Sequence, residues 1–159
     1  MEDKIFLFDK DSIEELINLY KMNNQTIGFT NGCFDLLHYG HVSLLKRASD
    51  LVDKLIVGLN SDQSVKKLKG HKRPICSEYE RAFILSSLIY VDIVIIFSEE
   101  TPYELIKIIK PNYLIKGSDP IKNYDGEDIV GVEFSDNIVR IPLIKDFSST
   151  NIINHIKTL

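Results

Sequence analysis

Short apolar runs alternate with amphipathic segments along almost the whole chain, and this alternation restricts the fold more than any other feature. The runs are nearly all apolar, which is typical of strands that are covered on both faces. The predicted strands are residues 25–29, 54–59, 92–97, 113–116 and 138–142. Strands that alternate with helices predict a parallel sheet with helices packed against it. We therefore expect an α/β sandwich on a five-stranded, mainly parallel sheet.

Helix start signals stand between the predicted strands. Ser12 and Ser77 each open a capping box, in which a glutamate follows three residues later, and Thr101 is an N-cap before a proline. The first helix is expected at 12–22. The sequence contains no internal repeat and no linker, and 159 residues suit one domain with a substantial core. We therefore expect a single domain over 1–159.

Charge and composition exclude several classes of function. The net charge is −4 at pH 7, so broad attraction to nucleic acid is not expected. The two cysteines, Cys33 and Cys76, suggest neither a disulfide framework nor a zinc cluster. No apolar stretch approaches the roughly 18 residues of a membrane span, and the first residues lack the form of a signal peptide. A cytoplasmic protein with no nucleic-acid or membrane partner is the expectation.

Residues 27–42 form the most informative stretch. An apolar run passes through Thr30-Asn31-Gly32 and reaches His38 and His41, after which apolar residues recur at helical spacing. This pattern predicts a strand, a glycine-containing turn and a helix start, with both imidazoles on the first helical turn. Backbone N–H groups are unpaired there and the helix dipole is positive. The stretch is therefore a candidate phosphate site.

Polar clusters follow the other predicted strands as well. They are Asn60-Ser61-Asp62, Ser98-Glu99-Glu100, Lys116-Gly117-Ser118-Asp119 and Ser148-Ser149-Thr150. In a parallel sheet these clusters share the carboxyl edge, where ligands bind near a topological switch. The most basic segment, 66–73, lies between two predicted helices of an otherwise acidic chain. A nucleotide-like ligand would suit this distribution, although the basic segment could also be a solvated loop.

Several separated motifs resemble one family. Thr-Asn-Gly-Cys-Phe-Asp-Leu-Leu-His-x-Gly-His at 30–41 is similar to the HxGH nucleotidyltransferase superfamily. Further motifs are Val-Gly-Leu-Asn-Ser-Asp at 57–62, Leu-Lys-Gly at 68–70, Arg73-Pro74, Glu80-Arg81, Lys116-Gly117-x-Asp119 and Ser-Ser-Thr-Asn-Ile-Ile at 148–153. Together they resemble the bacterial D-glycero-D-manno-heptose 1-phosphate adenylyltransferases, a cytidylyltransferase-like family whose domain also occurs fused to a heptose kinase. The resemblance covers about residues 25–157.

The resemblance implies a Rossmann-like three-layer sandwich that joins a sugar phosphate to a nucleotide. A sugar-phosphate oxygen would attack the α-phosphate of a nucleoside triphosphate, and pyrophosphate would leave. The partners that the resemblance implies are ATP and heptose 1-phosphate. Such chemistry depends on in-line positioning and on charge stabilisation. A Mg²⁺ ion would arrive with the triphosphate rather than in a protein cage. The resemblance also implies a homodimer and a role in lipopolysaccharide or capsule biosynthesis.

Residue roles follow from the matching motif positions. The catalytic residues implied are His38, His41 and Lys69. The nucleotide-binding residues implied are Thr30, Asn31, Gly32, Phe34, Gly40, Arg81, Lys116, Gly117, Asp119, Ser148, Ser149 and Thr150. The substrate-binding residues implied are Asp35, Asn60 and Arg73. Within these sets, Lys69 and Arg81 would neutralise phosphates, Ser148–Thr150 would hold the β- and γ-phosphates at a helix start, and Lys116, Gly117 and Asp119 would border the base and ribose.

The chain departs from the family pattern after strand 113–116. The family usually continues Lys-Gly-Gly-Asp-Tyr, whereas this chain has Lys116-Gly117-Ser118-Asp119-Pro120, and 121–128 is a longer connection. Proline fixes φ and removes an N–H, so the base or sugar could be held differently. Two alternatives therefore stay open: a cytidylyltransferase that uses CTP with glycerol 3-phosphate or another small phosphorylated alcohol, and a catalytically silent nucleotide-binding module. A metal site at Asp35, His38 and His41 has no apparent fourth ligand.

Overall fold

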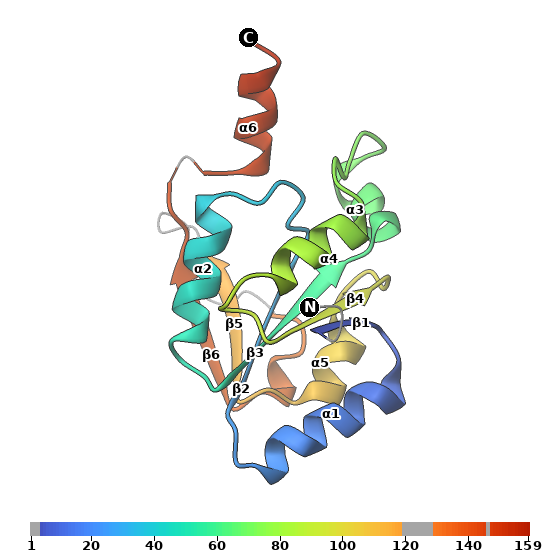
Figure 1. The fold of residues 1–159 in the computed structure, drawn as a ribbon, viewed down its shortest axis with the longest axis vertical. Coiled ribbons are helices and arrows are strands. Elements are labelled where there is room, and N and C mark those ends of the chain that lie inside the picture. The colour runs from blue at the N-terminus through green and yellow to red at the C-terminus, as the bar shows by residue number, and fades with distance from the viewer. Residues whose placement is uncertain (1–3, 119–128, 146) are drawn as a thin grey trace.

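A six-stranded parallel sheet forms the centre of the molecule (Figure 1). The computed structural model describes residues 4–118, 129–145 and 147–159. The strands are β1 (Ile5–Leu7), β2 (Ile27–Gly32), β3 (Lys54–Asn60), β4 (Ile93–Phe97), β5 (Tyr113–Ser118) and β6 (Asn137–Pro142). Their order is β1-β4-β3-β2-β5-β6, and every paired neighbour runs parallel. The expected α/β class is confirmed.

The sheet has six strands, so the prediction of five was wrong. The missing strand is β1, three residues at the sheet edge whose Ile5 pairs with Val94 of β4. Its apolar run is too short to stand out from the sequence, and its partner lies far along the chain. The first helix also begins earlier than predicted. Asp9, not Ser12, is its N-cap, because the Asp9 carboxylate accepts the Ser12 N–H at 3.0 Å.

Helices follow the strands closely in sequence. They are α1 (Lys10–Met22), α2 (Tyr39–Ser49), α3 (Asp62–Lys69), α4 (Glu78–Ser86), α5 (Tyr103–Ile109) and α6 (Ser149–Ile156), with a short 3-10 turn, η2 (Val132–Phe134). The Ser77–Glu80 capping box predicted for α4 is present, and Ser148 caps α6 as predicted. For α5 the N-cap is Pro102 rather than Thr101.

Two apolar cores lie on the two faces of the sheet. One core joins α2 and α4 to the sheet through residues such as Leu45 and Leu85, and the other joins α1 and α5 through residues such as Ile13 and Ile106. In Figure 1, α6 projects beyond the sheet at the end where α2 begins. Helix α6 therefore stands beside the carboxyl edge of β2.

The strand order reverses between β2 and β5. From β2 the chain builds β3 and β4 on one side, and then crosses over to add β5 and β6 on the other side. Ligands in open parallel sheets bind outside the carboxyl ends of the strands at this switch. The ends of β2 and β5 are therefore the first place to look for a site.

Candidate functional site

The turn that leaves β2 is shaped around Phe34. The φ of Phe34 is 44°, a left-handed value that is uncommon for a residue with a side chain. Its ring is buried, and its centroid lies 5.0 Å from that of the His41 ring. A Cβ at Gly32 would lie 3.1 Å from the Phe34 ring, so glycine leaves the ring room to pack there. The turn therefore places the Phe34 ring against the His41 ring.

His38 and His41 stack at the start of α2. His38 is the N-cap, with extended backbone, and His41 lies in the first turn. The ring centroids are 3.7 Å apart with an interplanar angle of 22°. A Cβ at Gly40 would lie 3.1 Å from both Cε1 and Nδ1 of His38, so the glycine between the histidines lets the His38 ring fold back over the helix. The placement of both imidazoles on the first turn agrees with the prediction.

The environment keeps both imidazoles neutral near pH 7. Burial lowers the pKa of His38, and the charge of Lys69 lowers it further. Burial, with the charges of His38 and Lys69, lowers the pKa of His41 to about 3, against a smaller opposite effect of the Leu36 carbonyl. Within the described part of the chain, Nδ1 of each ring is buried without a hydrogen-bond partner. An anion at this place would offset the repulsion and favour protonation.

The start of α6 and the end of α3 meet this histidine pair. The Ser149 hydroxyl donates to the Leu36 carbonyl at 3.2 Å, and the Ser148 hydroxyl accepts the Asn151 N–H at 3.1 Å. Thr150 is exposed on the first turn of α6. Lys69 is exposed at the end of α3, close enough to act on both histidine pKa values. The structure therefore brings the start of α6 and Lys69, two of the predicted phosphate-binding elements, close to the start of α2.

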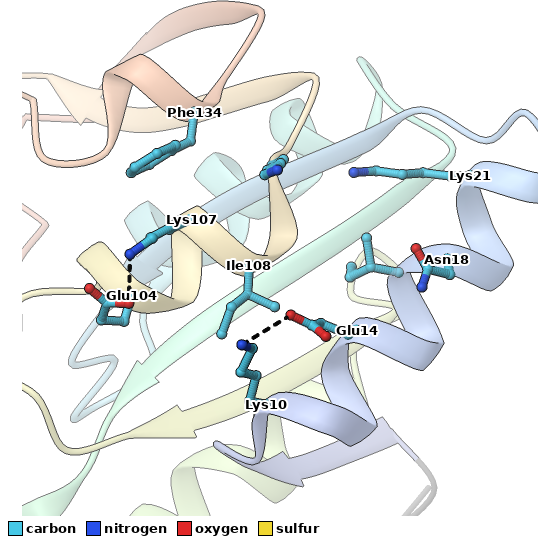
Figure 2. A pocket seen from close by; sticks show the side chains of 10 residues that line it. Lys10, Glu14, Asn18, Lys21, Glu104, Lys107, Ile108 and Phe134 are labelled. Carbon is cyan, nitrogen blue, oxygen red and sulfur yellow. Dashed lines mark hydrogen bonds and ion pairs between the residues drawn. The ribbon is translucent and has the colours of Figure 1, made fainter.

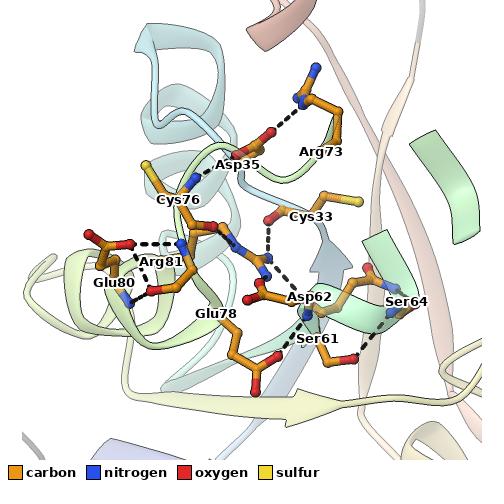
Figure 3. Close-up of polar contacts among 12 residues, drawn as sticks. Cys33, Asp35, Ser61, Asp62, Ser64, Arg73, Cys76, Glu78, Glu80 and Arg81 are labelled. Carbon is orange, nitrogen blue, oxygen red and sulfur yellow. Dashed lines mark hydrogen bonds and ion pairs between the residues drawn. The ribbon is translucent and has the colours of Figure 1, made fainter. Parts of the chain in front are cut away.

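Arg81 occupies a different position from the one expected of a phosphate ligand. Its side chain is fully buried, and its guanidinium donates to the carbonyls of Cys33 (2.6 Å), Asn60 (2.8 Å) and Cys76 (3.0 Å) and to the Asp62 carboxylate (2.7 Å) (Figure 3). These partners come from the β2–α2 turn, the end of β3, the start of α3 and the segment before α4. Arg81 therefore joins the segments that surround the site instead of facing open space.

Asp35 and Arg73 form a second buried link beside it. Asp35 is 2% exposed and accepts from Arg73 Nε and from the N–H groups of Ile75 (2.6 Å) and Cys76 (3.2 Å). Burial raises the pKa of Asp35, but these hydrogen bonds and the Arg73 charge outweigh burial and lower it. The resemblance implied a substrate-binding role for Asp35, and in the structure its carboxylate accepts three hydrogen bonds from within the protein. Nη2 of Arg73 is buried without a described partner.

The other predicted residues gather on the opposite side of β2. A pocket of about 350 Å³ is lined by Asn31, Asn60, Lys116 and Gly117, among others. Lys116 Nζ donates to Asn31 Oδ1 across the switch between β5 and β2. Burial lowers the pKa of Lys116 to about 8. Thr30 is buried within β2, and Asp119, like the 121–128 connection, lies outside the described residues.

Arg140 also lines this pocket, although no motif in the sequence marked it as a site residue. Thr101 and Glu100, the latter from the polar cluster expected at the carboxyl edge, line it as well. Arg140 is the cross-strand neighbour of Lys116 in the β5–β6 register. The one signal in the sequence was that Arg140 is a charged residue in a mainly apolar strand. That signal points to the pocket only once β6 is known to pair with β5.

Other hollows lie away from the strand ends. A groove of about 560 Å³ lies between α1 and α5. Lysines and glutamates pair on the surfaces of these helices, as Lys10 does with Glu14 (Figure 2). Across residues 4–118, 129–145 and 147–159, no group of three His, Cys, Asp or Glu side chains could hold a metal ion. No helix in the described part of the chain is both long and apolar enough to cross a membrane.

The chain matches one protein family over most of its length. The model of the cytidylyltransferase-like family covers residues 29–155. The bifunctional protein HldE of Campylobacter jejuni is 49% identical over 146 residues, and that of Aliarcobacter butzleri is 50% identical over 147. Each match covers 92% of this chain but 31% and 30% of the relative, so the chain spans about a third of the length of these relatives.

Solved structures show the same architecture. A lipopolysaccharide core biosynthesis protein from Thermoplasma volcanium matches with a TM-score of 0.63 and 28% identity, over 76% of this chain and 99% of that one. Pantoate–β-alanine ligase from Francisella tularensis matches with a TM-score of 0.61 and 20% identity, over 98% of this chain and 78% of that one. The second likeness concerns the fold alone.

Proposed function

Because the chain belongs to the cytidylyltransferase-like family, we propose that this nucleotidyltransferase joins the AMP moiety of ATP to heptose 1-phosphate and releases pyrophosphate. The observation that carries the proposal is the stacked His38–His41 pair at the start of α2, with Lys69 and the start of α6 beside it. The similarity to HldE proteins supports the choice of substrates.

The reaction would be one in-line displacement. An oxygen of the acceptor phosphate forms a bond to the α-phosphorus, the bond from that phosphorus to the bridging oxygen breaks, and pyrophosphate takes the electron pair. No proton has to leave the attacking oxygen, since the phosphate is already anionic. The protein therefore has to align two anions and stabilise the charge that grows on the leaving group.

The histidines would act as hydrogen-bond donors to the triphosphate. Their lowered pKa values leave them neutral in the free protein, where each ring carries one N–H, and protonation beside the triphosphate would give each ring a second donor. The unpaired amides at the starts of α2 and α6 would add further donors, and Lys69 would add a positive charge. Mg²⁺ would be held by the triphosphate and water, since no described cluster of side chains forms a cage. It would offset phosphate charge.

A cytidylyltransferase activity is the second candidate, because the family takes its description from such enzymes. ATP and CTP should each be supplied with heptose 1-phosphate and with glycerol 3-phosphate while pyrophosphate release is measured. The adenylyltransferase proposal expects turnover with ATP and heptose 1-phosphate, and at least about tenfold less after His41→Asn. Preference for CTP would favour the second candidate. Tight nucleotide binding without turnover for any pair would leave only a binding module.

We also propose a homodimer, as the resemblance implies, and a cytoplasmic location. Support for the dimer comes from exposed apolar side chains along and before α4, including Ile75, Tyr79 and Phe83. Exposed apolar side chains that gather on one surface are typical of contact sites between proteins.

A further inference from the structure

The pocket beside Lys116 lies on the other face of the sheet from the histidine pair. Phe29 packs in the α1–α5 core, and side chains alternate along a strand, so Asn31 of β2 faces the same side as Phe29. By the same alternation Lys116 follows Leu114 of that core, and α2 with its histidines lies against the opposite core. The end of β2 therefore separates two polar sites.

Two cationic side chains and one carboxylate are among the described residues that line the pocket. Lys116 donates a hydrogen bond to the neutral amide oxygen of Asn31, and no described carboxylate forms an ion pair with it. Arg140 stands next to Lys116 in the sheet register and lines the same pocket. Glu100 is the one acidic residue among the described lining residues. A half-buried ammonium without a counter-ion favours an anionic ligand.

A short chain of contacts links this pocket to the histidines. Lys116 binds Asn31, the next residue Gly32 packs under the Phe34 ring, and that ring contacts His41. A transfer between two phosphates requires two anions to meet while each is held by its own donors. The histidine side already gathers donors for one of them. The Lys116 pocket, on the opposite face of the sheet at the end of β2, has cationic side chains that could hold the second anion.

We propose, on the basis of the function proposed above, that this pocket binds the phosphorylated acceptor and that Lys116 is its charge anchor, with Arg140 as a second cation. The acceptor would lie at the switch between β2 and β5, and the triphosphate would lie over the start of α2. This placement differs from the family expectation that Lys116 borders the base and ribose. It makes Lys116 a residue that selects an anionic acceptor.

Two substitutions at Lys116 test this assignment. Lys116→Met should raise the KM for heptose 1-phosphate at saturating ATP by at least about tenfold and leave the KM for ATP within about twofold. Lys116→Arg keeps the charge and should recover most of the loss. Lys107→Met, which removes an exposed lysine paired with Glu104 on α5, should change neither constant. Circular dichroism melting confirms that each variant is folded.

The pH dependence gives an independent readout. Above about pH 8 the wild-type Lys116 loses its charge, so the KM for the acceptor should rise between about pH 7 and about pH 10, and Lys116→Arg should flatten this rise. The other charged groups among the described lining residues are Arg140 and Glu100. The histidines lie across β2, and their pKa values are lowered in the free protein.

The outcomes separate the inference from the proposed function. A rise in the KM for ATP after Lys116→Met, without a change for the acceptor, would return Lys116 to the nucleotide and overturn the inference. Turnover with both constants unchanged would overturn it as well, while the proposed function would stand. If no substrate pair gives turnover, calorimetric titration of heptose 1-phosphate into the wild type and Lys116→Met decides: equal binding, or none to the wild type, refutes the inference.

Discussion

His41 is held in an environment that opposes its protonation and that would suit an anionic ligand. Its ring is packed against His38 and Phe34, and its pKa falls to about 3 because burial and two neighbouring positive charges oppose protonation. A free histidine has a pKa near 6.5. The free protein thus holds a neutral ring where a triphosphate would supply the missing negative charge. We infer that nucleotide binding raises the pKa of both histidines.

Protonation of His41 should make the protein less stable in acid. Between about pH 6.5 and about pH 3 the unfolded chain binds a proton at this residue and the folded chain does not. The free energy of unfolding therefore falls as the pH falls, by up to ~1.4 kcal/mol per pH unit from this group. Urea unfolding at a series of pH values should show a shallower slope for His41→Asn. His155→Asn, on the exposed side of α6, should keep the wild-type slope; equal slopes in all three proteins would contradict the account.

Gly40 tests the packing of the histidine pair separately from its charge. Alanine favours a helix over glycine by about 1 kcal/mol, so Gly40→Ala should not destabilise α2 by propensity. Its Cβ, however, would lie 3.1 Å from His38 and 3.3 Å from Phe147 Cβ, so one of them must move. We expect turnover to fall at least about fivefold while the melting temperature changes little. Ser43→Ala in the same helix is the control, and unchanged turnover with Gly40→Ala would show that the ring position is not critical.

At the scale of elements, the site depends on loops that are linked to one another. Arg81 connects the turn after β2, the end of β3 and the segment before α4, while Asp35 accepts two amides of that same segment. The Glu78 carboxylate adds a bond from the Asp62 N–H at 2.7 Å. These contacts hold the loops around the site in place before any ligand binds. A reaction that depends on the alignment of its substrates requires such preorganisation.

The sequence predicted the helices, the main strands and the histidine pair because those signals are local. Capping boxes and apolar runs are complete within a few residues, as at Ser77. Arg81 gave a partial signal, since an arginine in the first turn of a helix opposes the dipole. Its partners could not be predicted, because they come from four segments, three of them distant in the sequence. Likewise, the Lys116–Asn31 contact depends on β2 pairing with β5, and the strand β1 depends on a distant partner.

Substituting lysine for Arg81 separates a linking role from a phosphate-binding one. Lysine keeps the charge but cannot reach four acceptors on three sides. If Arg81 links the loops, Arg81→Lys should lower the free energy of unfolding by roughly 3 kcal/mol, because buried carbonyls lose their donors. The control is Arg47→Lys, since Arg47 donates from the surface to the Pro142 carbonyl at 3.1 Å. Urea unfolding measures both; wild-type stability with weakened nucleotide binding would instead support the phosphate role.

At the scale of the whole molecule, the strand order explains why two anions could meet. The reversal between β2 and β5 opens the carboxyl edge to both faces of the sheet, with α2 on one side and the Lys116 pocket on the other. Reaction partners that approach from opposite faces can align without sharing donors. The same arrangement leaves the outer surface of α4, which does not border the pocket, available for contact with another copy.

The exposed side of α4 predicts how such copies associate. Tyr79 and Phe83 lie four residues apart on one face of the helix, 65% and 50% exposed. If this face forms the homodimer contact, Phe83→Glu introduces a charge into it and should weaken dimerisation at least about tenfold, or 1.4 kcal/mol. Light scattering over a concentration series measures this. Leu19→Glu makes the same kind of change at an exposed leucine on α1 and should leave the dimer intact. Dissociation by Leu19→Glu alone would place the contact on α1, and a wild-type monomer would refute the homodimer.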